Sequence, residues 1–312
     1  MELVTLNEID GAARRIAGSV TQTPVVTGPR GTRELWLKAE SLQPSGAFKL
    51  RGATNALLRL DPGHREAGVV THSSGNHGWA LAHAARQLRL PCAVVVPHGA
   101  AEGKVAAIRE AGAEILPVPA AERAGTAEQL AAERGATLIP PFDHPDIIAG
   151  QGTVGLEIIE QRPDVAVVVV PVGGGGLASG VATVIRALRP EVTVLGAEPE
   201  LAADAAESLA TGRLTPWSPE RTARTIADGL RTGLSELTFA HLRARLDGIV
   251  TVGEDEIRKA MRSLAAEARL VAEPSGAVAP AAVMGGHTPR GRTVAVVSGG
   301  NVNLTLLGQV LA

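Results

Sequence analysis

VAVVVVPVGGGGLASGVATVI, residues 165–185, is the stretch from which the fold can be deduced. It carries no charge and is long enough to cross a bilayer as one helix. Pro171 and four glycines, residues 173–176, lie at its centre, where they would destabilise such a helix. A buried strand, a glycine-rich turn and a shorter helix fit these residues better. We therefore expect a soluble α/β protein with no membrane span.

Short β-rich runs alternate with helical patterns along most of the chain. GVVTH (68–72) predicts a strand, and the following NHGWALAHAARQLR predicts a helix because Trp79, Ala82 and Ala85 recur at helical spacing. The alternation continues through CAVVVP and GKVAAIREAG and ends with the strand and glycine turn of TVAVVSGGN. Repeated βαβ units indicate mostly parallel sheets with helices on both faces.

The alternation restarts after residue 143 with the helical pattern GQGTVGLEIIEQ. This break predicts two three-layer α/β lobes. We place a large domain at 1–67 and 144–312, with a small domain at 68–143 inserted in it. A cleft between two lobes is the expected place for a ligand.

Composition excludes several classes of function. The net charge of −2, the lack of long basic runs and an aromatic content of 2 % give no reason to expect nucleic-acid binding. The single cysteine, Cys92, has no partner for an internal disulfide, which favours a reducing compartment. The acidic start MELVTLNEID lacks a secretory signal pattern, so we expect a cytoplasmic protein.

Four glycines follow the buried strand, and their bare N–H groups at a helix start suit a phosphate. Gly173, Gly175 and Ala178 also satisfy a dinucleotide pattern, and Glu198 ends the next strand, where a ribose-binding acid would lie. Tight packing alone is the least favoured reason for four glycines, because they cost backbone entropy. A phosphate is therefore expected, of a kind that these residues leave open.

Lys49 in SLQPSGAFKLRGA (41–53) has a position suited to chemistry. Ser45 is the expected N-cap, which puts Lys49 in the first helical turn. The helix dipole and burial beside Phe48 would both favour the neutral amine, the form that attacks carbonyls. A surface lysine beside Arg51 is the alternative from this window alone. A phosphate turn elsewhere in the chain favours a lysine that forms a Schiff base.

Two further turns follow predicted strands. THSSGNHGWA places Ser73, Ser74, Asn76 and His77 where free N–H groups suit a carboxylate, although a capping serine and a packed histidine would explain them too. VVSGGN places Ser298 at a similar strand end, where a simple turn serine is the alternative. Loops at the carboxyl ends of parallel strands converge on one ligand crevice.

Taken together, LKAESLQPSGAFKLRGA, SSGNHG, GGGGL and SGGNVN resemble, in order, the signature segments of the fold-type II pyridoxal-phosphate (PLP) enzymes, whose fold is tryptophan synthase β-like. Within that group the chain most resembles the serine/threonine dehydratase and serine racemase family. The resemblance runs from near the N-terminus to the C-terminus. Four ordered motifs are more specific than one glycine pattern, so the dinucleotide alternative is set aside.

The resemblance implies a role for each matching residue. Lys49 would hold PLP as a Schiff base with Phe48 packed nearby, and Asn76 would contact the phenolic oxygen of PLP. Ser298 would face the pyridine nitrogen, with Gly229 of IADGL and Glu273 of VAEPSGA near the cofactor. The phosphate would be bound by Gly173, Gly174, Gly175, Gly176 and Leu177.

The turn at 73–77 would hold the carboxylate of a small amino-acid substrate through Ser73, Ser74, Asn76 and His77. A hydroxyl such as Ser298 stabilises a pyridinium less than a carboxylate does, which favours prompt β-elimination over long-lived carbanions. Family racemases have a serine at position 74 as the acid/base opposite the lysine, and racemisation needs two such groups. Some dehydratases share this turn, so Ser74 permits racemisation without requiring it.

GAEPELAAD resembles the divalent-cation loop of the family. The resemblance implies Glu198, the Ala202 carbonyl and Asp204 as ligands for Mg²⁺, Ca²⁺ or Mn²⁺, all of which accept oxygen ligands. An ordinary acidic surface loop is the alternative.

We therefore expect a PLP-dependent dehydratase that converts serine or threonine to a 2-oxo acid and ammonia, as a homodimer in the family manner. The alternatives are a serine racemase with side elimination, a 3-hydroxyaspartate dehydratase and an inactive PLP-binding partner subunit. Trp79 replaces a smaller family residue and would pack against the turn or narrow the site. Arg123 would reach a second substrate carboxylate or lie solvated on a helix. No regulatory domain is expected after SGGNVN.

Overall fold

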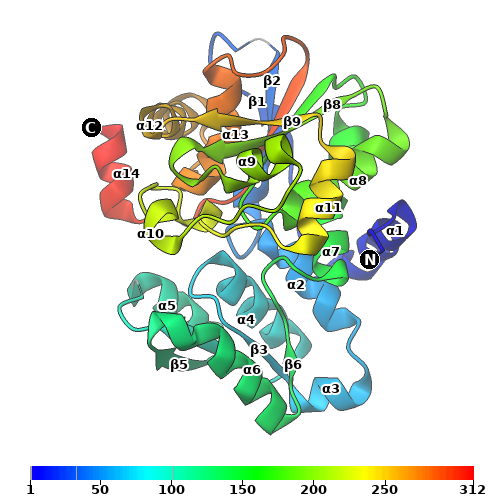
Figure 1. Cartoon of the computed structure of the whole chain (residues 1–312), viewed down its shortest axis with the longest axis vertical. Coiled ribbons are helices and arrows are strands. Elements are labelled where there is room, and N and C mark those ends of the chain that lie inside the picture. The colour runs from blue at the N-terminus through cyan, green and yellow to red at the C-terminus, as the bar shows by residue number, and fades with distance from the viewer. Residues whose placement is uncertain (1, 33, 101) are drawn as a thin grey trace.

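Two sheets organise the computed structural model, which describes residues 2–32, 34–100 and 102–312 (Figure 1). The larger sheet has the strand order β1-β2-β10-β7-β8-β9, in which only the β1–β2 pair is antiparallel. Its strands are β1 (Val25–Thr27), β2 (Leu35–Ala39), β7 (Val167–Pro171), β8 (Thr193–Pro199), β9 (Gly248–Val252) and β10 (Thr293–Val297). The mostly parallel α/β fold predicted from the sequence is confirmed.

The smaller sheet is wholly parallel, in the order β5-β4-β3-β6. Its strands are β3 (Val69–Thr71), β4 (Cys92–Pro97), β5 (Glu114–Val118) and β6 (Thr137–Leu138), and its helices are α4 (Asn76–Leu88), α5 (Glu102–Glu110) and α6 (Arg123–Arg134). All of these elements lie within 68–143, in the lower half of Figure 1. The domain boundaries remain a prediction, because Leu50 and Leu57 of α2 (Lys49–Leu58) also pack in the cluster that covers this sheet.

Alternate residues of β7 enter two different cores. Val167 and Val169 pack with α12 and α13, whereas Val168 and Val170 pack with α7 and α8. Both faces of the strand are therefore buried, which explains its unbroken run of valines. The covering helices are α1 (Leu6–Ile16), α7 (Pro145–Gln161), α8 (Gly176–Leu188), α12 (Glu254–Ser263) and α13 (Pro274–Met284).

The remaining helices lie around these layers. They are α3 (Pro62–Ala67), α9 (Asp204–Thr211), α10 (Pro219–Thr222), α11 (Glu236–Arg245) and α14 (Leu304–Leu311), with short helical turns η1 (Glu40–Leu42), η2 (Ala120–Glu122), η3 (Glu200–Ala202), η4 (Asp228–Leu230) and η5 (Leu264–Ala268). The stretch 165–185 forms β7, a turn and α8, as predicted. Among the described helices, none has both the length and the apolar character needed to cross a bilayer.

The predicted cap of α2 was wrong. The helix begins at Lys49 with Phe48 as its N-cap, not at Ser45. Gly46 has φ of +70°, Ala47 bridges to Gly299, and the Phe48 N–H donates to the Ser298 carbonyl at 3.0 Å. This tertiary pairing keeps residues 46–48 out of the helix and still leaves Lys49 in its first turn.

Candidate active site

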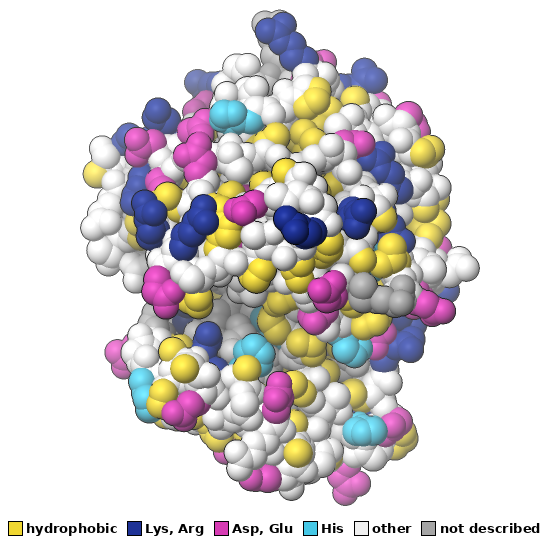
Figure 2. All heavy atoms as spheres, in the orientation of Figure 1, with side chains coloured by type: hydrophobic (Ala, Val, Ile, Leu, Met, Phe, Trp, Pro, Cys, Tyr) yellow, Lys and Arg dark blue, Asp and Glu magenta, His cyan; other side chains and the backbone are white. Residues whose placement is uncertain are grey.

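The sequence-predicted segments meet at the carboxyl ends of parallel strands. The turn before α4 follows β3, the glycine turn follows β7, and Ser298 follows β10 directly. Direct contacts join them: the Asn76 amide donates to Glu273 at 2.5 Å, and the Asn301 amide donates to Asn76 Oδ1 at 2.8 Å. The surface is hollowed between the two lobes on the face seen in Figure 2. These residues therefore form one site between the lobes.

The Lys49 amine lies inside this cluster. Nζ donates to the Pro141 carbonyl at 2.7 Å and lies 5.0 Å from the centroid of the Phe48 ring. Burial lowers the pKa of Lys49 to about 8, although part of the residue stays accessible. A larger share of the amine is therefore neutral near pH 8 than for a solvated lysine.

The glycine turn has no room for side chains. A Cβ on Gly174 would lie 2.5 Å from the Phe142 ring, and one on Gly173 would lie 2.9 Å from Leu230 Cα. Gly175 has φ of +84° and precedes the first residue of α8. Tight packing, the least favoured explanation from sequence, therefore accounts for part of the glycine requirement. The bare N–H groups at the start of α8 also fit a phosphate.

The turn at 73–77 presents both backbone and side-chain groups. Ser74 is partly exposed, and the Gly75 N–H donates to Ser73 Oγ at 3.3 Å. His77 is buried and contacts the Ile139 carbonyl through Nε2 at 3.1 Å, while its Nδ1 has no hydrogen-bond partner among the described residues. Burial, followed by the charge of Lys49, lowers the pKa of His77 to about 3, so the ring is neutral. The contact with Ile139 favours a packing role for His77, and its predicted substrate role stays a prediction.

A chain of hydrogen bonds links Ser298 to the IADGL segment. Ser298 is buried and its Oγ donates to the Ser275 carbonyl at 3.5 Å. Ser275 Oγ accepts the Gly229 N–H at 2.9 Å. A Cβ on Gly173 would also lie 3.2 Å from the Gly229 carbonyl, which puts Gly229 beside the glycine turn. The structure thus brings these predicted cofactor residues together.

Glu273 lies at the N-cap of α13 and is buried. Burial, followed by the charge of Asp228, raises the pKa of Glu273 to about 7. Its carboxyl is therefore partly protonated at neutral pH, and it carries less negative charge toward Asn76 than an ordinary glutamate would.

The predicted cation ligands lie apart from this cluster. Glu198 ends β8 and accepts N–H bonds from Ala205 at 3.1 Å and Ala206 at 2.7 Å, so it caps α9 and not the glycine turn. Burial, opposed by these bonds and aided by Asp204, raises the pKa of Glu198 to about 8, and burial likewise raises the pKa of Asp204. Two buried carboxyls of this kind fit a divalent cation. Among the described residues no cluster of three His, Cys, Asp or Glu suits a metal, and the predicted set has two carboxylates with the Ala202 carbonyl.

The two residues that departed from family expectation have separate positions. Trp79 packs against the cluster between α4 and α5 that contains Ile108, not into the site. Arg123 begins α6 and donates to the Ala120 carbonyl at 3.2 Å. Its charge, after burial, helps to lower the pKa of His72, so the two residues are near each other at the end of β3.

Sequence reasoning missed a buried ionic network beside Lys49 that contains Lys38, Glu40, Arg51 and Glu157. It also gave no role to Asn301, although the repeated asparagines of SGGNVN were a signal for one. Asn301 holds Asn76 and donates to the Ser45 carbonyl at 2.9 Å.

Comparison with known proteins gives this geometry a family. The family model described as "Pyridoxal-phosphate dependent enzyme" matches residues 16–299. A serine racemase of Dictyostelium discoideum is 39 % identical, covering all of this chain and 99 % of the relative. A putative threonine dehydratase of Sinorhizobium fredii is 40 % identical over 99 % of this chain and 95 % of the relative. An L-threo-3-hydroxyaspartate ammonia-lyase of Pseudomonas sp is 39 % identical over 100 % and 99 %.

Solved structures agree. Maize serine racemase superposes with a TM-score of 0.92 at 37 % identity, over 99 % of this chain and 97 % of that one. The threonine deaminase of T.th. gives a TM-score of 0.89 at 43 % identity, over 96 % and 99 %. Because the family model spans most of the chain and these relatives match over nearly their full length, the chain belongs to the family of pyridoxal-phosphate-dependent enzymes and has its fold-type II architecture.

Proposed function

We propose that the chain is a dehydratase that converts small β-hydroxy amino acids such as L-serine and L-threonine to a 2-oxo acid and ammonia. The observation that carries this proposal is the Lys49 amine, whose pKa is lowered to about 8 by burial where the glycine turn, the 73–77 turn and Ser298 converge. The dehydratase and ammonia-lyase names of full-length relatives support the same reaction class.

PLP, when bound, supplies an aldehyde for a lysine amine and a ring that withdraws electrons from the substrate Cα. We assign Lys49 to the aldehyde and Gly173, Gly174, Gly175, Gly176 and Leu177 to the phosphate. Asn76, Gly229, Glu273 and Ser298 would lie around the ring, with Phe48 packed beside it. The lack of side chains on the glycines and the buried, neutral character of the serine suit these roles.

Within this site Lys49 Nζ would take the proton from the substrate Cα, and the β-hydroxyl would leave as water. A pKa near 8 keeps enough neutral amine for this at physiological pH. Ser298 is a hydroxyl, and the nearby Glu273 has a raised pKa, so negative charge near the ring is weak. That environment favours departure of the β-group over a persistent carbanion. The released enamine is hydrolysed in water to the 2-oxo acid and ammonia.

The decisive experiment is a screen of L- and D-serine, L-threonine and 3-hydroxyaspartate for 2-oxo acid release. Release from serine or threonine supports the proposal, and preference for hydroxyaspartate supports that alternative, with Arg123 as its second carboxylate partner. If PLP binds and no hydroxy amino acid is consumed, the inactive-partner alternative replaces the dehydratase. We also propose a homodimer in the cytoplasm, which light scattering of the purified protein and cell fractionation would test.

Serine racemase is the second candidate, because Ser74 lies partly exposed on the turn before α4 and several full-length relatives carry that name. Ser74→Ala is expected to lower D-serine formation from L-serine by about 100-fold or more, since a two-base reaction loses one base. Pyruvate release from L-serine should change by less than about threefold. Chiral chromatography with a pyruvate assay measures both. D-Serine formation that survives the substitution would exclude Ser74 as the second base.

We propose a divalent cation, Mg²⁺, Ca²⁺ or Mn²⁺, at Glu198, the Ala202 carbonyl and Asp204. Because the folded-state pKa of Glu198 is raised to about 8, its stabilising contribution is present below its ordinary pKa and is lost as pH rises toward 8. A cation replaces the missing proton. Mg²⁺ is therefore expected to raise Tm by about 3 °C at about pH 8.5 and by less than about 1 °C at about pH 5.5.

Differential scanning fluorimetry in Mg²⁺ or in chelator measures this effect. Asp204→Asn should abolish the response to Mg²⁺, whereas Glu191→Gln, which alters an exposed glutamate paired with Arg189, should keep it. An equal response at both pH values would contradict the site.

A further inference from the structure

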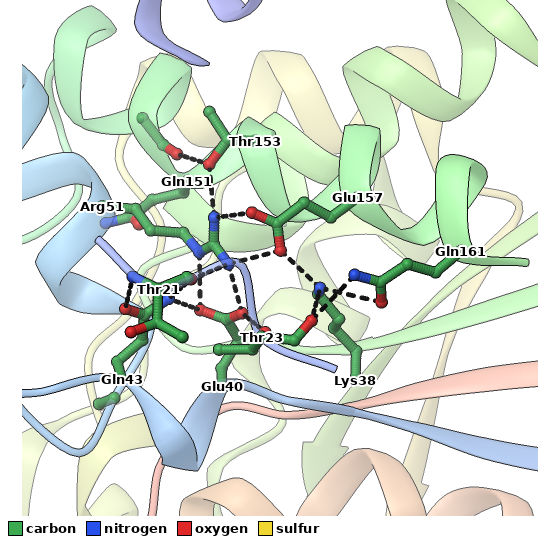
Figure 3. A network of polar contacts seen from close by, with 12 residues as sticks. Thr21, Thr23, Lys38, Glu40, Gln43, Arg51, Gln151, Thr153, Glu157 and Gln161 are labelled. Atoms are coloured by element: carbon green, nitrogen blue, oxygen red, sulfur yellow. Dashed lines mark hydrogen bonds and ion pairs between the residues drawn. The ribbon is translucent and has the colours of Figure 1, made fainter. Parts of the chain in front are cut away.

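A network of buried charges lies on the side of α2 away from the cleft (Figure 3). The side chains of Lys38, Glu40 and Arg51 are fully buried, and that of Glu157 is 13 % exposed. Two cations therefore face two carboxylates in the interior of the large lobe. Such groups are costly to bury unless each is paired in a well-defined geometry.

Arg51 is the centre of the network. Its guanidinium binds Glu40 through Nε and Nη2, both at 2.7 Å, and Glu157 through Nη1 at 2.6 Å and Nη2 at 2.8 Å. Nη1 also donates to Thr153 Oγ1 at 3.1 Å, and Nη2 to the Thr21 carbonyl at 3.3 Å. All five N–H groups of the planar fork thus have acceptors, an arrangement that a lysine ammonium does not reproduce.

Lys38 completes the charge balance from β2. Its amine binds Glu157 at 2.5 Å and the Thr23 carbonyl at 2.5 Å. Burial would raise the pKa of Glu40, but the adjacent Arg51 outweighs it and holds that pKa below its ordinary value. The carboxylate therefore stays ionised and the ion pair stays intact at neutral pH.

The partners of Arg51 enclose the segment that carries Lys49. Glu40 comes directly after β2, and Arg51 is the third residue of α2, so their ion pair joins the two ends of 40–51. Residues two apart on a helix point in nearly opposite directions. Arg51 therefore anchors α2 from behind while the Lys49 amine points to Pro141 across the cleft.

Glu157 adds a second helix to this anchor. A Cβ on Gly150 of α7 would lie 2.6 Å from Gly52 Cα, so the backbones of α2 and α7 are in contact next to Arg51. That contact fixes the distance between the helices. The forked bonds from Arg51 to Glu157 fix the rotation of α2 about its own axis.

We propose that Arg51, Glu40 and Glu157, here named the Arg51 clamp, are positioning residues that hold the Lys49 amine in its reactive place. The proposal rests on the proposed function, because it takes Lys49 as the lysine that binds PLP. The clamp contacts none of the residues at 73–77 assigned to the substrate carboxylate. Its loss should therefore affect the chemical step more than substrate binding.

The test uses the PLP-loaded enzyme with Arg51→Lys, which keeps the charge and loses the fork. We expect kcat to fall about 100-fold with KM within about threefold, since small misplacement of a catalytic group costs about that much. The pH midpoint of the visible cofactor absorbance, measured without substrate, should shift from that of the natural enzyme. Glu157→Gln, which keeps the Arg51–Glu40 pair, should change both in the same direction by a smaller factor, and it carries the test if Arg51→Lys does not fold.

Two controls separate positioning from general stability. Arg59→Lys alters an exposed pair with Asp146 on the same helix, and it should leave kcat and the absorbance midpoint unchanged. Ile257→Ala empties a fully buried position under α12, so Tm should fall while the midpoint stays. If both clamp variants lower Tm alone and keep kcat and the midpoint, the clamp is only structural and the proposal is wrong. If the natural protein never acquires the cofactor absorbance, the proposed function has failed instead.

Discussion

Lys49→Ala is expected to abolish turnover of serine and threonine, with a fall in kcat on the order of 10⁴-fold or more. The substitution removes the amine that would bind the aldehyde of PLP and the base that would take the substrate proton. Both functions depend on one nitrogen, whose pKa is about 8 because burial disfavours its charge. The visible absorbance of the bound cofactor should disappear together with the activity.

The composition of the chain makes this prediction easy to test. The sequence contains only four lysines: Lys38, Lys49, Lys104 and Lys259. Borohydride reduction of the PLP-loaded protein followed by peptide mapping should label Lys49 alone, because Lys38 is buried with Glu157 and Lys104 is paired with Asp228 at 2.5 Å. Lys259→Ala, at an exposed position of α12, is the matched control and should keep activity and label. Label on another lysine, or activity in Lys49→Ala, would overturn the assignment.

The parts of this molecule that sequence predicts well are those with local causes. The β7 strand, its turn and α8 follow from a valine run, four glycines and a helical pattern, and none of these depends on a distant partner. The meeting of Lys49, Asn76 and Ser298 follows from topology, because loops at the carboxyl ends of parallel strands converge. Ordered motifs then identified the cofactor.

Features with distant causes were not predictable in the same way. Glu157 lies 106 residues from Arg51, and a charge in the middle of a helical pattern indicates a solvated side chain until its partner is known. Ser45 was a reasonable N-cap by residue type, yet the bond between Phe48 and Ser298 displaced the start of the helix. His77 likewise belongs to a turn by sequence and contacts Ile139 by tertiary structure.

Gly174→Ala is expected to weaken PLP binding by about 10- to 100-fold, the equivalent of the 1–3 kcal/mol that overpacking usually costs. The added Cβ would meet three atoms of the Phe142 ring at 2.5 to 2.7 Å, so the turn must move. That movement displaces the N–H groups at the start of α8 that we assign to the phosphate. Titration of the apoprotein with PLP, followed by absorbance, measures the change.

Two further variants show whether crowding against Phe142 is the cause. Gly103→Ala also adds a methyl group, but it meets open space on α5, and it should leave PLP affinity unchanged. Phe142→Ala combined with Gly174→Ala should recover much of the lost affinity, because the smaller residue leaves room for the new Cβ. Recovery would show that the turn itself can bind PLP once the clash is relieved. Equal weakening in the single and double variants would mean that Gly174 matters for a reason other than its contact with this ring.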